Sequence, residues 1–138
     1  MKVFVYGSLK RGNWNHRFYL SDSEFICEAK TMDSNYDMVN LGSFPAMENE
    51  GRYYISGEVY EVNRRTLSKL DNLEGNGYFY TREKIGVFPT DEQTSAWFYA
   101  WAYIISSSHR SVSRLIPPDS FNTKSWSMED VGKYQGDL

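Results

Sequence analysis

Residues 96–105, with the sequence AWFYAWAYII, form the longest apolar and aromatic run in the chain. Side chains alternate between the two faces of a β-strand. This run therefore places its tryptophan and tyrosine rings on one face and its alanine, phenylalanine and isoleucine side chains on the other. Because both faces are apolar, we expect the strand to be buried on both sides, either in a barrel or in a sheet covered by helices.

Outward from this strand, shorter runs of β-branched, aromatic and alternating residues predict further strands. They are residues 2–6, 24–32, 36–41, 54–62 and 78–87. Residues 42–52 contain Pro45 and two glycines, and are predicted to be a loop around a short strand at residues 44–47. From about residue 106 the chain is polar, and we expect an extended C-terminal tail that wraps around the body.

One clear helix is predicted after the strand at residues 54–62. Asn63 is a suitable N-cap, because its side chain can accept a hydrogen bond from the first helical turn. Three leucines then recur at every third position: Leu67, Leu70 and Leu73. This spacing predicts an apolar stripe on a helix over residues 64–74, which Gly75 ends. With a shorter helical turn within residues 14–20, the pattern indicates an α+β fold.

Composition and charge exclude several classes of protein. The 138 residues fit one domain, residues 1–138, and the net charge of −3 argues against non-specific binding of nucleic acid. The sequence contains no run of 18 apolar residues, so it predicts no membrane span. The apolar run at residues 3–6 is too short for a signal peptide, so we expect a cytoplasmic protein. Aromatic residues make up 17% of the chain, which exceeds what a small core needs, so some rings are expected to line a groove.

Neither a metal nor a cofactor is expected. Cys27 is the single cysteine, which leaves no intrachain disulfide and no cysteine-based zinc site, and we interpret it as a small core residue. His16 and His109 do not have the spacing of metal ligands. The chain also lacks a P-loop and a dinucleotide-binding fingerprint.

The end of the first strand is the first candidate for a binding site. The strand stops at Gly7 within Tyr6-Gly7-Ser8-Leu9. A strand that ends in a sharp turn exposes consecutive backbone N–H groups, which can hold a carboxylate or a developing oxyanion. The alternative is an ordinary turn from a strand into a loop.

Glu74 is the second candidate, at the end of the predicted helix. The leucine stripe drifts around the helix, which brings Glu74 near the buried side beside Leu70. The negative end of the helix dipole and partial burial would both raise the pKa of this carboxyl group and suit it to acid–base catalysis. The alternative is a solvated glutamate at a helix end.

These segments resemble the γ-glutamylcyclotransferase-like proteins, and within them the AIG2-like, or γ-glutamylamine cyclotransferase, group. The first matching block is YGSLKRG at residues 6–12, followed by Asn15 and His16. The second comprises GEVY at residues 57–60, LDNLEG at residues 70–75 and YFYTR at residues 78–82. The order and spacing of these blocks over residues 1–82 make the resemblance specific.

The resemblance implies a small mixed β-barrel flanked by helices, with a pocket at one end. It implies that Tyr6, Gly7, Ser8 and Leu9 bind a γ-glutamyl group, largely through backbone N–H groups. Glu74 matches the catalytic acid–base of the family. The implied reaction is attack of the α-amine of a γ-glutamyl unit on its own side-chain amide, which releases 5-oxoproline without a metal, cofactor or covalent intermediate.

The rest of the pocket is expected from neighbouring segments. Tyr80 and Arg82 lie on one face of their predicted strand. We expect Tyr80 to face the site with Glu74, and Arg82 to form an ion pair with Asp71, although both can also lie on the barrel exterior. The leaving group is expected to meet residues 44–47, residues 78–80 and the tail. A catalytically silent module that binds a small metabolite on the same fold is the alternative function.

Overall fold

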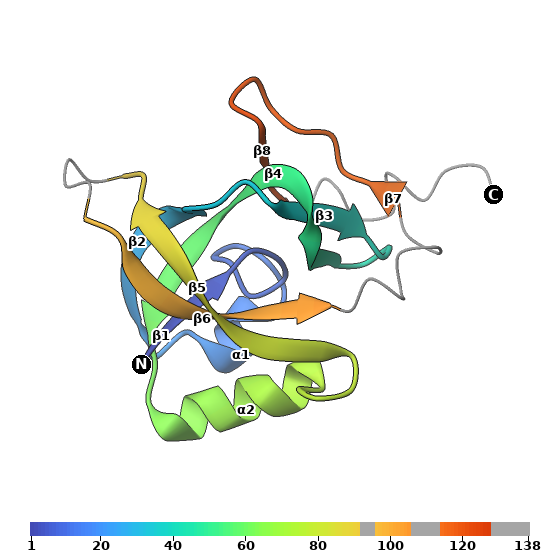
Figure 1. Cartoon of the computed structure of the whole chain (residues 1–138). Coiled ribbons are helices and arrows are strands. Elements are labelled where there is room, and N and C mark those ends of the chain that lie inside the picture. Colours follow the sequence, from blue (N-terminus) through green and yellow to red (C-terminus); the bar gives the residue numbers. More distant parts are fainter. Residues whose placement is uncertain (92–95, 106–113, 128–138) are drawn as a thin grey trace.

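Five strands close into a mixed barrel in the computed structural model, which describes residues 1–91, 96–105 and 114–127 (Figure 1). The ring runs, in order, through β1 (Lys2–Val5), β6 (Phe98–Ile105), β5 (Tyr80–Pro89), β2 (Glu24–Thr31) and β4 (Pro45–Glu61). It closes because β4 also pairs with β1, where Val5 lies opposite Glu58. β6 runs parallel to β1 and β4, and the other pairs in the ring are antiparallel. The α+β barrel expected from the sequence is confirmed.

The long strand β4 corrects the predicted loop at residues 42–52. β4 begins at Pro45 and runs for 17 residues. Proline has no N–H group to donate, and this is tolerated at the first residue of a strand. Its first part pairs with β3 (Tyr36–Asn40), and its second part pairs with β1 and β2. Between the pairs Asp37–Glu48 and Tyr36–Tyr53, four residues of β4 have no opposite number in β3. These polar residues are exposed, which is why their composition resembles that of a loop.

The aromatic strand β6 is buried on one face only along its first half. Ala100 and Ala102 face the interior and are fully buried, whereas Trp97 and Tyr99 are 48% and 59% exposed. The prediction that both faces of residues 96–105 are buried is therefore wrong at this end. The barrel interior covers the inner face of β6, and among the described residues no helix covers the outer face of its first half. The burial pattern changes further along β6, where Tyr103, Ile104 and Ile105 are all buried.

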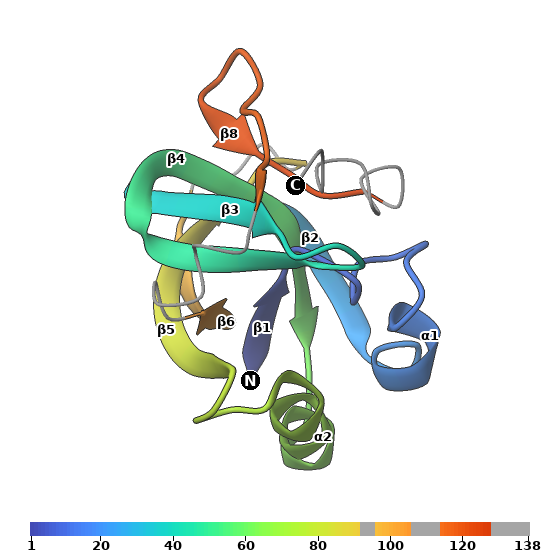
Figure 2. The same cartoon turned by 90° about the vertical axis from the view of Figure 1, so that its right-hand side faces the viewer.

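Two helices among the described residues flank the barrel. α1 (His16–Tyr19) is short, and α2 (Arg64–Glu74) is the helix predicted from the leucine stripe. The Asn63 side chain accepts a hydrogen bond from the Thr66 N–H at 2.8 Å, which caps the start of α2. Leu67 and Leu70 are buried in the core. Figure 2 shows α2 at the end of the barrel beside the start of β1.

The segment from 114 to 127 lies on the side of the barrel opposite α2 (Figures 1 and 2). Its strands β7 (Arg114–Leu115) and β8 (Thr123–Lys124) pair with β3 and β4. The Lys124 ammonium contacts the Asp37 carboxylate at 2.6 Å in a buried ion pair, and Trp126 is 1% exposed in the core. Of the tail expected from about residue 106, residues 106–113 and 128–138 lie outside the described residues.

Candidate functional site

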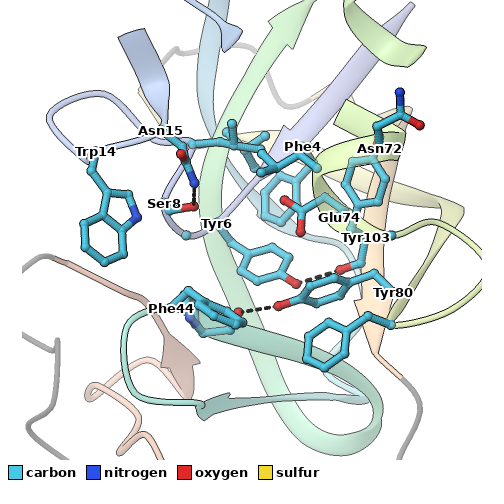
Figure 3. A pocket seen from close by; sticks show the side chains of 17 residues that line it. Phe4, Tyr6, Ser8, Trp14, Asn15, Phe44, Asn72, Glu74, Tyr80 and Tyr103 are labelled. Carbon is cyan, nitrogen blue, oxygen red and sulfur yellow. Dashed lines mark hydrogen bonds between the residues drawn. The ribbon is translucent and has the colours of Figure 1, made fainter. Parts of the chain in front are cut away.

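A cavity of about 480 Å³ lies where the end of β1, the end of α2 and the start of β4 meet (Figure 3). Every site residue predicted from the sequence lines it: Tyr6, Gly7, Ser8, Leu9, Glu74 and Tyr80. Further lining residues were not singled out: Phe4, Val5, Trp14, Asn15, Asn72, Leu73, Gly75 and Tyr103. The sequence therefore predicted which segments meet at the cavity, but only some of the residues that line it.

Glu74 is the last residue of α2, and its carboxyl group is partly buried in this cavity. Gly75 follows with a φ of 63°, a left-handed conformation that lets the chain turn away directly after Glu74. Burial raises the pKa of Glu74 to about 7. The cause is desolvation of the charged form, since no lysine or arginine occurs among the described residues that line the cavity. A carboxyl group with this pKa can both accept and donate a proton near neutral pH.

The loop of Tyr6, Gly7, Ser8 and Leu9, called the β1 loop below, leaves the sheet after Val5. The Gly7 and Ser8 carbonyl groups are occupied: Gly7 O accepts from Lys10 N–H at 3.0 Å, and Ser8 O accepts from Asn15 N–H at 3.0 Å. Within the described part of the chain, the N–H groups of Gly7, Ser8 and Leu9 donate no hydrogen bond. Three neighbouring donors at the cavity are thus available to a ligand.

Close packing explains why glycine occupies position 7. A Cβ atom on Gly7 would lie 2.8 Å from the Cδ and Cγ atoms of Pro45, well inside van der Waals contact. Pro45 begins β4 and itself lines the cavity. Gly7 therefore lets the β1 loop approach the opposite wall.

The chain after the β1 loop is tied to the barrel by Glu58. The Glu58 carboxylate accepts hydrogen bonds from Arg11 N–H at 2.9 Å and from the Tyr60 hydroxyl at 3.0 Å. Nearer the cavity, the Asn15 side-chain amide donates to Ser8 Oγ at 2.9 Å, which Figure 3 also shows. These contacts hold the β1 loop in one place relative to the barrel.

Tyrosine hydroxyl groups form much of the interior wall. Tyr6 donates to the Tyr103 carbonyl at 2.6 Å and accepts from Met47 N–H at 3.0 Å. Tyr80 donates to the Pro45 carbonyl at 2.9 Å. Desolvation is the main cause that raises the pKa of Tyr6 and Tyr80, and the negative charge of Glu74 adds to it, so both stay protonated at neutral pH. The expectation that Tyr80 points to the same cavity as Glu74 is met, because Tyr80 is only 4% exposed and lines it.

A second carboxylate lies one helical turn before Glu74. Asp71 forms the predicted ion pair with Arg82, with 3.0 Å between Asp71 Oδ1 and Arg82 Nε. The Tyr103 hydroxyl donates to the same oxygen at 2.7 Å. Tyr103 also lines the cavity, so its hydrogen bond to Asp71 connects the cavity lining to this ion pair.

On the far side of the cavity, the lining residues agree in part with those expected to meet the leaving group. Phe44 and Pro45 line it, as do Phe79 and Tyr80, whereas Tyr78 points to solvent and is 93% exposed. Tyr103 was missed although it belongs to the aromatic strand, because nothing in the sequence says which ring of that strand meets residue 6. Asn15 lay within the family-like opening block and carried the clearest signal among the missed residues.

The described residues contain neither a metal-binding cluster nor a membrane-spanning helix. No group of three histidine, cysteine, aspartate or glutamate side chains in residues 1–91, 96–105 and 114–127 is arranged to hold a metal ion. In the same residues, no helix has the length and apolar character needed to cross a membrane. Cys27 is buried in the core, as predicted.

The fold and the cavity define a small mixed-barrel protein whose described residues form a pocket that carries a carboxyl group. The sequence pattern of the family described as gamma-glutamyl cyclotransferase, AIG2-like, matches residues 3–127, and the chain belongs to this family. Members of the family are enzymes for small γ-glutamyl compounds, which agrees with a pocket of this size.

Individual relatives agree with this assignment. A Methanocaldococcus jannaschii protein, provisionally named a γ-glutamylcyclotransferase, is 43% identical over 98 residues, which cover 70% of this chain and 81% of the relative. The Escherichia coli γ-glutamylcyclotransferase family protein YtfP is 31% identical over 101 residues, 73% of this chain and 82% of the relative. A crystal structure of a mouse AIG2-like protein superposes with a TM-score of 0.68 at 26% identity, covering 77% of each chain.

Proposed function

We propose that this protein is a γ-glutamylcyclotransferase that releases 5-oxoproline from a γ-glutamyl amide, with Glu74 as its general acid–base. The observation that carries the proposal is the Glu74 carboxyl group, with a pKa raised to about 7, in a cavity that the unpaired N–H groups of the β1 loop also line. Family membership supports the reaction class.

Binding of the γ-glutamyl half falls to the β1 loop. The substrate carries an α-carboxylate, and the described lining residues include no cation to meet it. The N–H groups of Gly7, Ser8 and Leu9 supply donors instead. Held there, the α-amine lies close to the substrate's own amide carbon, so the attack is intramolecular and gains from orientation.

Glu74 moves the protons. As a carboxylate it takes a proton from the α-ammonium, and the freed amine attacks the side-chain amide carbon to form a five-membered ring. The carbonyl oxygen becomes negative, and N–H donors of the β1 loop stabilise that charge. The bond to the leaving nitrogen then breaks as Glu74 returns its proton to that nitrogen, and the second proton of the ring nitrogen passes to the departing amine. The products are 5-oxoproline and an ammonium ion of the leaving amine.

The decisive experiment is a panel of γ-glutamyl compounds assayed for 5-oxoproline. The panel contains γ-glutamylmethylamide, γ-glutamylalanine, γ-glutamyl-ε-lysine and glutathione, with release followed by mass spectrometry. We expect wild-type protein to release 5-oxoproline from at least one of them and the Glu74→Gln variant to release little. Full activity in a folded Glu74→Gln variant would contradict the mechanism.

The β1 loop has its own test. Gly7→Ala places a methyl group 2.8 Å from the Pro45 ring and forces the β1 loop away from the opposite wall. We expect KM to rise much more than kcat falls, because the loop binds substrate and moves no proton. Unchanged KM in a folded Gly7→Ala variant would show that the loop is not the binding element.

A silent binding module is the second candidate, since the cavity and the unpaired donors would serve a ligand equally well. A module of this kind would bind a γ-glutamyl compound or 5-oxoproline and turn over none of the panel. The raised pKa of Glu74 favours the enzyme, because desolvating a carboxyl group costs stability that a simple binder does not need to sacrifice.

A further inference from the structure

Three aromatic side chains form a continuous wall along one side of the cavity, called the aromatic wall below: Phe44, Phe79 and Tyr80. The Phe79 ring meets the Tyr80 ring edge to face, with 4.9 Å between centroids, and meets the Phe44 ring in the same way at 6.3 Å. Tyr80 is buried, whereas Phe44 and Phe79 are partly exposed, so the wall runs from the interior to the rim.

The wall begins beside the proposed acid–base. Glu74 and Tyr80 line the same cavity, and the negative charge of Glu74 adds to the desolvation that raises the pKa of the Tyr80 hydroxyl group. Phe79 and Phe44 continue the wall outward from Tyr80. A group that extends from a nitrogen atom held at Glu74 therefore has apolar ring surface beside it.

Charge is scarce in the same space. Among the lining residues that the structure describes, Glu74 is the one acidic side chain, and lysine, arginine and histidine do not occur. A second carboxylate on the ligand would thus lose water without gaining a cationic partner, and it would lie near the carboxyl group of Glu74. An uncharged ring loses little on leaving water and gains edge-to-face contacts.

From this wall we propose a leaving-group preference: the protein favours γ-glutamyl amides whose leaving amine carries an uncharged aromatic ring, and it disfavours those whose leaving amine carries a carboxylate. This inference rests on the proposed function. The leaving nitrogen must reach Glu74 to receive its proton, so its substituent lies along the aromatic wall. Phe79, in the middle of the wall, is then the main specificity-determining residue.

Three substrates and three variants test the preference. The substrates are γ-glutamylbenzylamide, γ-glutamylmethylamide and γ-glutamylglycine. The variants are Phe79→Ala, Phe79→Leu and the control Tyr78→Ala, which removes a ring that is 93% exposed and outside the cavity. We expect wild-type kcat/KM to be highest for the benzylamide and lowest for γ-glutamylglycine. Phe79→Ala should lower kcat/KM for the benzylamide about tenfold, in line with the usual worth of an aromatic pair, and change the methylamide value much less.

The remaining outcomes separate the two proposals. Phe79→Leu should recover part of the loss, and Tyr78→Ala should leave all three substrates unchanged. A higher kcat/KM for γ-glutamylglycine than for the benzylamide, or an equal loss for benzylamide and methylamide in Phe79→Ala, would overturn the preference while leaving the cyclotransferase intact. No 5-oxoproline from any substrate would instead contradict the proposed function.

A binding measurement tests the aromatic wall without turnover. N-benzylacetamide reproduces the neutral leaving half, and N-acetylglycine reproduces an acidic one. Titrated into wild-type protein and followed by NMR, N-benzylacetamide should shift the signals of Phe44, Phe79 and Tyr80 and bind more tightly than N-acetylglycine. Equal or weaker binding of N-benzylacetamide would overturn the inference even in an inactive protein.

Discussion

Asp71 and Glu74 lie one turn apart on the same helix, yet their surroundings differ. Asp71 contacts Arg82 and accepts a hydrogen bond from Tyr103. Glu74 faces a cavity whose described lining has no cation, and burial raises its pKa to about 7. The comparison teaches that two carboxylates on one helix can have different surroundings: Asp71 is held in an ion pair, whereas Glu74 is desolvated at a cavity.

Removing the exchangeable proton should have the largest effect. Glu74→Gln keeps the size of the side chain but cannot titrate. We expect turnover to fall about 10²–10⁴-fold, the usual worth of a positioned acid–base, while KM changes little. Steady-state kinetics on the best substrate of the panel measures both. The matched variant Asp71→Asn should lose far less activity, and similar losses in the two variants would erase the distinction between them.

The pH profile should follow Glu74. As the base, it must be ionised in the free enzyme, so kcat/KM should rise with pH and level off above about 7. Below that pKa the rate should fall about tenfold per pH unit. A profile measured from pH 5 to pH 9 gives the midpoint. A midpoint near pH 4.5, the ordinary value for glutamate, would show that burial does not act on the catalytic group.

Stability should respond in the opposite direction to pH at the same residue. The pKa of Glu74 is about 7 in the folded protein and near 4.5 in the unfolded chain, so the folded state holds the proton more tightly. Its contribution to stability is present below pH 4.5 and is lost as the pH rises to about 7. Glu74→Gln lacks this loss and should gain about 2 kcal/mol relative to wild type between pH 4 and pH 8, allowing for partial exposure. Urea unfolding at both pH values measures the difference, and a constant difference would contradict the burial of this carboxyl group.

Breaking the paired carboxylate should cost stability instead of chemistry. Asp71→Asn removes the negative charge opposite Arg82, whose side chain is 22% exposed. We expect the free energy of unfolding to fall by about 1–3 kcal/mol, between the values for exposed and buried pairs. Thermal unfolding measures this change. A variant as stable as wild type would show that the ion pair is only a surface contact.

Tyr103→Phe should give the smallest effect. It removes the hydroxyl group that donates to Asp71 and keeps the ring in the cavity lining. The loss should be about 1 kcal/mol, the usual net worth of one hydrogen bond. A double-mutant cycle with Asp71→Asn checks the assignment, because the two losses should not add if the hydrogen bond carries the effect. Full additivity would mean that Tyr103 and Asp71 act independently.

Local patterns in the sequence predicted the elements well wherever one residue sets a boundary. The N-cap at Asn63 and the left-handed Gly75 gave α2 its bounds, and the leucine stripe gave its buried face. The loop prediction at residues 42–52 failed because exposed polar residues continue β4 across the irregular pairing with β3. The burial of β6 was overestimated because apolar composition does not say which face of a strand a barrel leaves uncovered.

The sequence by itself determined where the candidate groups lie along the chain. Glu74 follows from a helix that ends at Gly75, and the β1 loop follows from a strand that stops at Gly7, both short-range effects of capping and turn geometry. Only the tertiary structure decided what surrounds them. Barrel closure brings Phe44, Tyr80 and Tyr103 to the same cavity as Glu74 from three separate strands or loops, and burial at this cavity removes water from the Glu74 carboxyl group. The raised pKa depends on that desolvation, which arises from long-range packing and is invisible in the order of residues.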